Sequence, residues 1–240
     1  MDHFSVEPED VQKSTLRLRG DEHKHLSRVL RKNVGDEIMA TDGMGLSFLL
    51  SIRSVGREVT ECEILETHPN LNEPLVEITL AVSLLRNPAR FDFLVEKVTE
   101  LGVRRIIPIQ CERTIPRHEK HLRLEKIALA AMKQSGRSYL PSISSLTEFH
   151  TLLTASESYS FRLMPDERAP VEDSLGTVFR SHETIKSVLA IIGPEGGFTE
   201  QEVELAKEAG FTIISLGSRR LRTETAAISL AAGIFQIYQA

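Results

Sequence analysis

The chain has 240 residues, of which 41% are hydrophobic and 26% charged, and its formal net charge at pH 7 is −5. These proportions exclude an intrinsically disordered chain, and the acidic total argues against a protein that coats nucleic acid over its whole surface. No apolar run approaches the roughly 20 residues that a membrane-spanning helix requires, so no membrane partner is expected. The first residues, MDHFS, carry neither the basic nor the apolar part of a secretory signal.

The two cysteines, Cys62 and Cys111, lie far apart in the sequence. Such sparse use excludes a disulfide framework or a zinc ribbon and is typical of a reducing compartment. The histidines lack carboxylate or cysteine partners at metal-ligand spacing, so no metal site is predicted. We therefore expect a cytoplasmic protein with two free thiols.

The N-terminal part of the chain has the pattern of short strands around one helix. The expected strands cover residues 15–19, 37–40, 46–55 and 58–65. The helix after the first strand places Leu26, Val29 and Leu30 on one face, and Asp42-Gly43 is a strong hairpin signal. This order predicts a small β-barrel-like domain over residues 1–70.

The pattern changes after residues 66–74, a polar segment with two prolines that is the best domain boundary in the chain. Beyond it, strands alternate with helices. The expected strands cover residues 78–85, 106–109, 159–164, 188–192 and 212–216, and the expected helices cover residues 91–101, 118–136, 199–209 and 224–239. The apolar positions of the second helix are Leu122, Ile127, Ala130 and Ala131. The alternation predicts an α/β domain over residues 75–240 with a mostly parallel sheet.

Two stretches are locally basic although the whole chain is acidic. The first lies between residues 17 and 32 and the second between residues 104 and 126. Local patches of this kind can supply phosphate contacts to a polyanion, while an ordinary solvated helix face remains the alternative. The candidate RNA-binding residues in these stretches are Arg17, Arg19, Lys24, His25, Arg28, Arg31 and Arg113. The histidines in them, His23, His25, His118 and His121, are expected to contact phosphate or solvent.

A glycine-rich turn follows the expected strand 188–192. Its sequence, GPEGG at residues 193–197, precedes Thr199 and Glu202, which have the spacing of a helix capping box. Glycines at the carboxyl end of a parallel strand allow the backbone to approach a ligand closely. The turn is neither GxGxxG nor a phosphate-binding P-loop, so nucleotide phosphate binding has little support, and a purely structural turn remains an alternative.

A second turn of similar kind follows the strand 212–216. It reads GSRRLRTETA over residues 217–226 and leads into the last expected helix. Its three arginines, at positions 219, 220 and 222, stand just before a helix N-terminus, which makes the region attractive to anions. Two such turns in consecutive units favour one shared ligand site over two unrelated surface loops.

Together, residues 192–198 (IGPEGGF) and 216–226 (LGSRRLRTETA) resemble the paired signatures of SPOUT-class RNA methyltransferases. More narrowly they resemble the RsmE family, whose members methylate N3 of a uridine in 16S ribosomal RNA. Residues 25–31, 91–103 and 134–137 support the resemblance, which therefore spans both expected domains. The chain departs from the family pattern at residues 86–90 (RNPAR), where a lysine and a more polar turn are expected, and at Arg220, where an aliphatic residue is usual.

The resemblance implies a PUA-like RNA-binding domain followed by an α/β methyltransferase domain tied in a deep trefoil knot. It also implies S-adenosylmethionine as the methyl donor, a homodimer, and 16S ribosomal RNA within a small-subunit particle as the partner. The residues that it assigns to the cofactor are Ile192, Gly193, Pro194, Glu195, Gly196, Gly197, Leu216, Gly217, Leu221, Arg222, Thr225 and Ala226.

The chemistry of this reaction suggests roles for three charged residues. Because N3 of uridine normally bears a proton, methylation there requires a proton acceptor or stabilisation of the anion. Arg222 is the candidate for stabilising negative charge on the uracil carbonyls, and Glu195 or Glu224 is the candidate proton acceptor. For Glu224, capping of the last helix is the favoured role over proton transfer.

Three other functions remain open at this point. One is a different SPOUT enzyme, such as a ribose 2′-O methyltransferase acting on transfer RNA or ribosomal RNA, which residues 25–31 disfavour. Another is a non-catalytic RNA-binding assembly factor, against which the intact glycines of both turns speak. The third is a Rossmann dehydrogenase, disfavoured because GxGxxG does not follow the first strand of the α/β domain.

Overall fold

The computed structural model describes residues 2–180 and 185–238. It divides the chain into two compact units, one formed by Met1–Glu73 with Met132–Leu140 and the other by Pro74–Ala131 with Pro141–Ala240. The break near residue 73 lies within the polar segment expected as the boundary. Residues 132–140, which the sequence pattern places in the second domain, group with the first unit.

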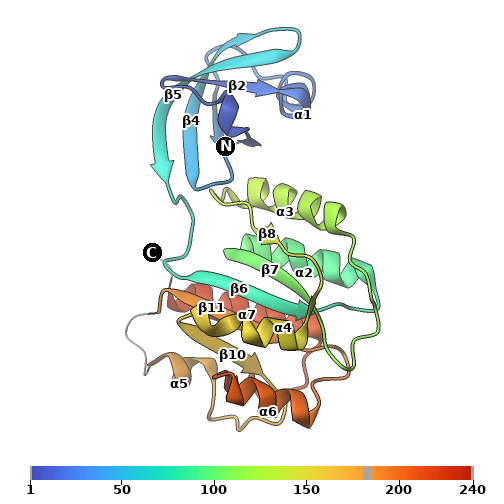
Figure 1. The fold of residues 1–240 in the computed structure, drawn as a ribbon. Coiled ribbons are helices and arrows are strands. Elements are labelled where there is room, and N and C mark those ends of the chain that lie inside the picture. Colours follow the sequence, from blue (N-terminus) through green and yellow to red (C-terminus); the bar gives the residue numbers. More distant parts are fainter. Residues whose placement is uncertain (1, 181–184, 239–240) are drawn as a thin grey trace. The chain divides into compact units, whose positions relative to one another are not determined.

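The first unit contains a five-stranded sheet in the order β1-β3-β4-β5-β2 (Figure 1). Its strands are β1 (His3–Ser5), β2 (Thr15–Arg19), β3 (Glu37–Thr41), β4 (Leu46–Val55) and β5 (Val59–Pro69). β1 and β3 are parallel, and the other neighbours are antiparallel. The alternating residues of these strands build one apolar core that includes Phe4, Leu18 and Leu50. All four strands expected from the sequence are present, and β1 is an additional one.

The expected end of the strand 58–65 is partly wrong, since β5 continues through residues 66–69 to Pro69. Polar residues are compatible with this end of the strand because most of its side chains are exposed. They therefore reflect an exposed strand end as well as a connection between units.

The predicted core face of the N-terminal helix is also partly wrong. Leu26 is buried, whereas Val29 is 66% exposed. The helix α1 (Gly20–Lys24) runs directly into a π-helical turn, His25–Val29, in which the amide of Leu30 donates to the carbonyl of His25. The wider turn changes the angular spacing of side chains, so the i, i+3 rule no longer holds beyond Leu26.

A buried ion pair holds residues 132–140 in the first unit. The Arg137 side chain, 1% exposed, donates to the Glu73 carboxylate at 2.7 Å. The same carboxylate accepts hydrogen bonds from the backbone amides of Ser138 and Tyr139, each at 3.0 Å. The motif at residues 134–137 therefore ends in a structural arginine rather than one that faces a ligand.

The second unit contains a seven-stranded sheet with the path β12-β10-β11-β6-β7-β8, and β9 also pairs with β7. Its strands are β6 (Glu77–Ser83), β7 (Val103–Gln110), β8 (Ser142–Ile143), β9 (Thr147–Glu148), β10 (Phe161–Pro165), β11 (Ser187–Ile192) and β12 (Thr212–Ile214). Every pairing in this sheet is parallel, which confirms the predicted strand arrangement.

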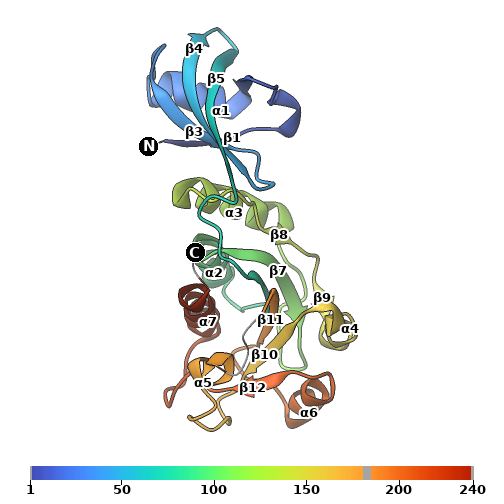
Figure 2. The same cartoon turned by 90° about the vertical axis from the view of Figure 1, so that its left-hand side faces the viewer.

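Helices cover both faces of this sheet (Figure 2). They are α2 (Pro88–Glu100), α3 (His121–Ser135), α4 (Phe149–Thr154), α5 (Leu175–Arg180), α6 (Glu200–Glu208) and α7 (Thr223–Ile237). Residues of α2, α3, α5 and α7 form one apolar cluster with the sheet, and residues of α4 and α6 form a second cluster on the opposite face. Successive residues of the central strand β11 alternate between the two clusters, which is why its sequence is continuously apolar.

Two details of the second unit differ from the prediction. In α3 the core positions within this unit are Leu124, Ala128 and Ala131, while Leu122 is 74% exposed, so the predicted apolar face is wrong in part. β7 is an eight-residue strand rather than a four-residue one. Its Pro108 lies between the two short partners β8 and β9, where the missing amide hydrogen is tolerated.

Both cysteines are buried and free. Burial raises the pKa of the Cys62 thiol to about 11 and raises that of Cys111 as well. None of the helices within residues 2–180 and 185–238 combines the length and the apolar character that crossing a membrane requires.

Candidate functional site

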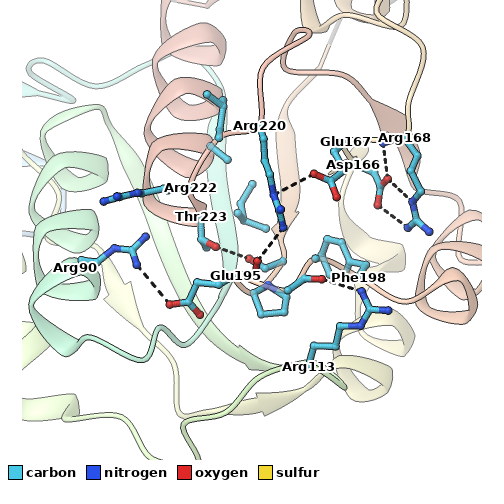
Figure 3. A pocket seen from close by; sticks show the side chains of 17 residues that line it. Arg90, Arg113, Asp166, Glu167, Arg168, Glu195, Phe198, Arg220, Arg222 and Thr223 are labelled. Atoms are coloured by element: carbon cyan, nitrogen blue, oxygen red, sulfur yellow. Dashed lines mark hydrogen bonds and ion pairs between the residues drawn. The ribbon is translucent and has the colours of Figure 1, made fainter.

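A cavity of about 620 Å³ opens at the carboxyl ends of β10 and β11, next to the turn that follows β12 (Figure 3). In a parallel sheet these ends share one edge, where loops from neighbouring strands converge. The lining residues are Arg90, Arg113, Asp166, Glu167, Arg168, Ile192, Gly193, Pro194, Glu195, Gly196, Gly197, Phe198, Arg220, Leu221, Arg222, Thr223 and Ala226. All of them belong to the second unit.

The turn after β11 is shaped by its glycines. A Cβ atom on Gly193 would lie 2.9 Å from the ring of Phe198, which is buried against Phe149. Gly197 has a φ of +70°, a left-handed conformation that favours glycine. The predicted capping box at the start of α6 is confirmed, because the Thr199 and Glu202 side chains exchange hydrogen bonds with each other's backbone.

The turn after β12 lies directly against the turn after β11. The hydroxyl of Thr223 donates to the carbonyl oxygen of Gly193 at 3.0 Å. Behind this contact lies a second cavity of about 90 Å³, lined by Leu216, Gly217 and Leu221 among others. The two turns therefore form one continuous site, as expected for a shared ligand.

Most residues predicted to bind the cofactor line one of these two cavities. The larger cavity contains residues 192–197 together with Leu221, Arg222 and Ala226, and the smaller one adds Leu216 and Gly217. Thr225 lines neither cavity and is exposed. Thr223, which the sequence did not single out, is buried and lines the larger cavity instead.

A third loop, which sequence reasoning missed, contributes Asp166, Glu167 and Arg168. It follows β10, and its only sequence signal is that position at the end of a parallel strand. Arg168 donates to both carboxylate oxygens of Asp166, at 2.8 and 2.9 Å. Burial works against ionisation of Asp166, but the hydrogen bonds from Arg168 hold its pKa below the ordinary value. This pair fixes the loop beside the cavity.

Arg90 is a second residue that the sequence did not identify. It lies in the first turn of α2, after Asn87, whose side chain caps the helix. Its guanidinium donates to both carboxylate oxygens of Glu224, at 2.8 and 2.6 Å, and lies 3.6 Å from the Glu195 carboxylate. Burial opposes ionisation of Glu224, but the bonds from Arg90 hold its pKa below the ordinary value. Glu224 is thus an ionised partner of Arg90, which makes it a poor proton acceptor.

Five arginines line the larger cavity, and they differ in their partners. Arg90 and Arg168 bind carboxylates, Arg113 donates to the carbonyl of Gly196 at 2.8 Å, and Arg220 donates to the carbonyl of Glu195 at 3.4 Å. Among the residues that the structure describes, no acceptor is recorded for Arg222, whose side chain is exposed. Arg222 is therefore available to a bound ligand.

The remaining RNA-binding candidates lie in the first unit, apart from Arg113, which lines the cavity just described. Arg17, Arg19 and Lys24 form exposed or half-exposed ion pairs with Glu61, Asp10 and Asp21. His25, Arg28 and Arg31 are exposed, and within the described residues no ion pair is recorded for them.

One of the histidine predictions is wrong. His23 is only 4% exposed and shares a 2.8 Å hydrogen bond with the Thr60 hydroxyl, so it contacts neither phosphate nor solvent. His121 lies 3.2 Å from the carboxylate of Glu125 on the next turn of α3. Within the described part of the chain, no group of three or more His, Cys, Asp or Glu side chains is placed to hold a metal ion.

Comparison with known families matches both units. Residues 71–235 match the model of an RNA methyltransferase domain, and residues 18–64 match that of an RNA methyltransferase PUA domain. The first matched segment contains the α/β sheet, and the second lies within the part of the chain that forms the smaller five-stranded sheet.

Similar proteins cover nearly the whole chain. A ribosomal RNA small subunit methyltransferase E from Synechocystis is 31% identical over 92% of this chain and 73% of the relative. The protein of the same name from Bacillus subtilis is 29% identical over 88% of this chain and 86% of the relative. A crystal structure of a ribosomal RNA small subunit methyltransferase E from Neisseria gonorrhoeae, bound to S-adenosyl methionine, has 31% identity and a TM-score of 0.85 over 99% of this chain and 98% of that one. The chain therefore belongs to the RNA methyltransferase family that includes the ribosomal RNA small subunit methyltransferases E.

Proposed function

We propose that this protein transfers a methyl group from S-adenosylmethionine to N3 of a uridine in 16S ribosomal RNA. The observation that carries the proposal is the joining of two glycine-bearing turns, by the bond from Thr223 to Gly193, around a cavity of about 620 Å³. A volume of this order is typical of small-molecule and cofactor sites. The names of the relatives and the donor bound in the Neisseria gonorrhoeae protein support the same reaction.

The residues present fit the proposed donor. At Gly193 a side chain would collide with Phe198, so the backbone here stays bare and its polar groups can face a ligand. The smaller cavity adds the apolar side chains of Pro165, Leu216 and Leu221, which suit an aromatic ring system. When bound, the donor supplies a methyl group already activated by a sulfonium centre, so the protein's main task is to position the two reactants.

Charged residues near α2 are suited to act on the uracil base that receives the methyl group. Arg90 and Arg222 both act electrostatically on Glu224, which places them at one side of the cavity. We assign to Arg222 the stabilisation of negative charge on the uracil carbonyls as the N3 proton leaves. Glu195 accepts that proton, and its carboxylate lies at the cavity beside Arg90. The electron pair freed at N3 then forms the new bond to the methyl carbon, while the carbon–sulfur pair stays on sulfur.

The proposal extends to the RNA-binding unit, the knot, the homodimer and the cytoplasmic location that the resemblance implies. The first unit, with the exposed residues His25, Arg28 and Arg31, binds RNA. The second unit is a knotted SPOUT domain, supported by the way in which the last helix starts against the turn after β11. The protein acts as a homodimer on a small-subunit particle in the cytoplasm.

The test is a methylation assay on isolated 16S RNA and on small-subunit particles, with the product nucleoside identified by mass spectrometry. We expect 3-methyluridine from at least one substrate, and far less of it in the same time with Arg222→Ala. Lys186→Ala, which removes an exposed lysine just before β11, outside both cavities and both basic stretches, is the matched control. A ribose-methylated product would identify a different enzyme of the class, and failure to bind the donor in calorimetry would favour a non-catalytic RNA-binding protein.

A further inference from the structure

Arg220 connects all three loops at the cavity. It belongs to the turn after β12, its Nε lies 3.3 Å from the carboxylate of Glu167 in the loop after β10, and its Nη2 donates to the carbonyl oxygen of Glu195 in the turn after β11 (Figure 3). Three backbone segments that end three adjacent strands are thus tied by one side chain.

The position of Arg220 matters because it lines both the larger and the smaller cavity. The smaller one, at about 90 Å³, is too confined to hold a ligand of cofactor size by itself. A ligand that fills both cavities must therefore contact Arg220. The other residues shared by the two cavities are Asp166, Glu167, Leu221 and Ala226.

The contacts of Arg220 are suited to breaking and reforming. Its side chain is 70% exposed and that of Glu167 is 60% exposed. Exposed ion pairs contribute little net free energy because water competes for both partners. By contrast, Arg168 and Arg90 hold their carboxylates with two short bonds each. Of these three contacts between an arginine and a carboxylate, that of Arg220 is therefore the most easily broken.

We propose that Arg220 is a strap over the cofactor cleft, which opens to admit the methyl donor and closes again over it. Its release from Glu167 and Glu195 lets the donor reach the smaller cavity, and the restored contacts then slow the donor's escape. Arg220 is thus a positioning residue that sets the exchange rates of the donor. This inference rests on the proposed function, because it takes S-adenosylmethionine as the ligand.

The test measures association and dissociation rates of S-adenosylmethionine by surface plasmon resonance, since the chain has no tryptophan to report binding by fluorescence. The variants are Arg220→Ile, which removes the strap, and Glu167→Gln, which removes the charge of its anchor. Lys126→Ile is the control for loss of one exposed positive charge. 5′-Methylthioadenosine, which lacks the amino-acid part of the donor, serves as the second ligand.

We expect Arg220→Ile to raise both rate constants about two- to fivefold, the range that exposed ion pairs can supply, and to change the dissociation constant less than either rate. Glu167→Gln should shift both rates in the same direction by a smaller factor, and Lys126→Ile should match the parent protein. The acceleration should occur for both ligands, because a strap acts on entry and exit rather than on one group of the ligand.

Two results would overturn the strap while leaving the proposed function intact. One is unchanged rate constants in Arg220→Ile. The other is a loss of affinity for S-adenosylmethionine alone, without a change for 5′-methylthioadenosine or in Glu167→Gln, which would show that Arg220 binds the donor's carboxylate. If the parent protein binds neither ligand, both the strap and the proposed function fail.

Discussion

Thr223 and Gly193 are thirty positions apart in the sequence, and the hydroxyl of the first donates to the carbonyl oxygen of the second at 3.0 Å. This bond joins the N-terminus of α7 to the turn after β11, so the two halves of the cofactor cleft share one boundary. Thr223 is only 5% exposed, which shields the bond from competing water. The Thr223 hydroxyl therefore helps to fix the relative position of the two turns, together with the exposed bond from Arg220 to the carbonyl of Glu195.

Replacing Thr223 with valine keeps the shape of the side chain but removes the donor. Since the partly buried carbonyl of Gly193 then loses its partner, we expect the free energy of unfolding to fall by about 1 kcal/mol and the dissociation constant for S-adenosylmethionine to rise roughly tenfold. Calorimetry and denaturant titration measure the two effects. Thr223→Ser retains the hydroxyl and should keep most of the affinity, and equal losses in both variants would contradict a role for the bond.

Arg222→Ala should lower turnover by about 10²- to 10³-fold, as expected when a group that stabilises developing charge is removed. Affinity for the donor should change much less, because Arg222 is assigned to the acceptor base. Single-turnover kinetics and calorimetry separate the two quantities. Arg222→Lys, which keeps a charge without the planar fork, should be intermediate. Equal losses of turnover and donor affinity would remove Arg222 from the catalytic role.

Glu224 makes a contribution to stability that depends on pH. Its pKa is lower in the folded protein than the ordinary value of 4.5. A carboxyl group of this kind stabilises the fold fully above its unfolded pKa, and the contribution is lost as the pH falls through the folded pKa. The difference in unfolding free energy between the parent protein and Glu224→Gln should therefore be largest near neutral pH and shrink below about pH 4.5. Denaturant titrations at several pH values measure it, and a constant difference would contradict the assigned ionisation.

The buried pair of Glu73 and Arg137 should be essential for the first unit. Glu73→Ala leaves the Arg137 charge buried without this partner and two backbone amides without their acceptor, so we expect a loss of about 3–5 kcal/mol in the free energy of unfolding. Thermal and denaturant unfolding measure it.

A double variant, Glu73→Leu with Arg137→Met, is the control for the buried pair. It removes both charges and should recover part of the loss, but not all of it, because the amides of Ser138 and Tyr139 still lack the Glu73 carboxylate as an acceptor. A double variant less stable than Glu73→Ala would contradict the assumption that removing the carboxylate from the Arg137 charge is the main cost.

Features that depend on neighbouring residues were predictable from the sequence. Alternating apolar residues marked the strands of the first unit, continuous apolar runs marked central strands of the second, and the spacing of Thr199 and Glu202 marked the start of α6. The two turns proposed to bind the cofactor were recognisable because their glycines and arginines directly follow apolar strands. Their approach in space also followed from the pattern, since strands in a parallel sheet end at the same edge.

Other features arise from contacts between distant parts of the chain, and no local pattern encodes them. Arg90 meets Glu224 across 134 positions, and Arg113 meets Gly196 across 83, because the order of strands in the sheet brings their loops together. The π-helical turn at His25–Val29 interrupts the regular helical period. The buried face of α3 keeps that period, but which side of the helix is buried depends on where it meets the sheet. Local propensities thus specify the strands and the two turns, whereas the charges that complete the site come together only when the sheet has formed.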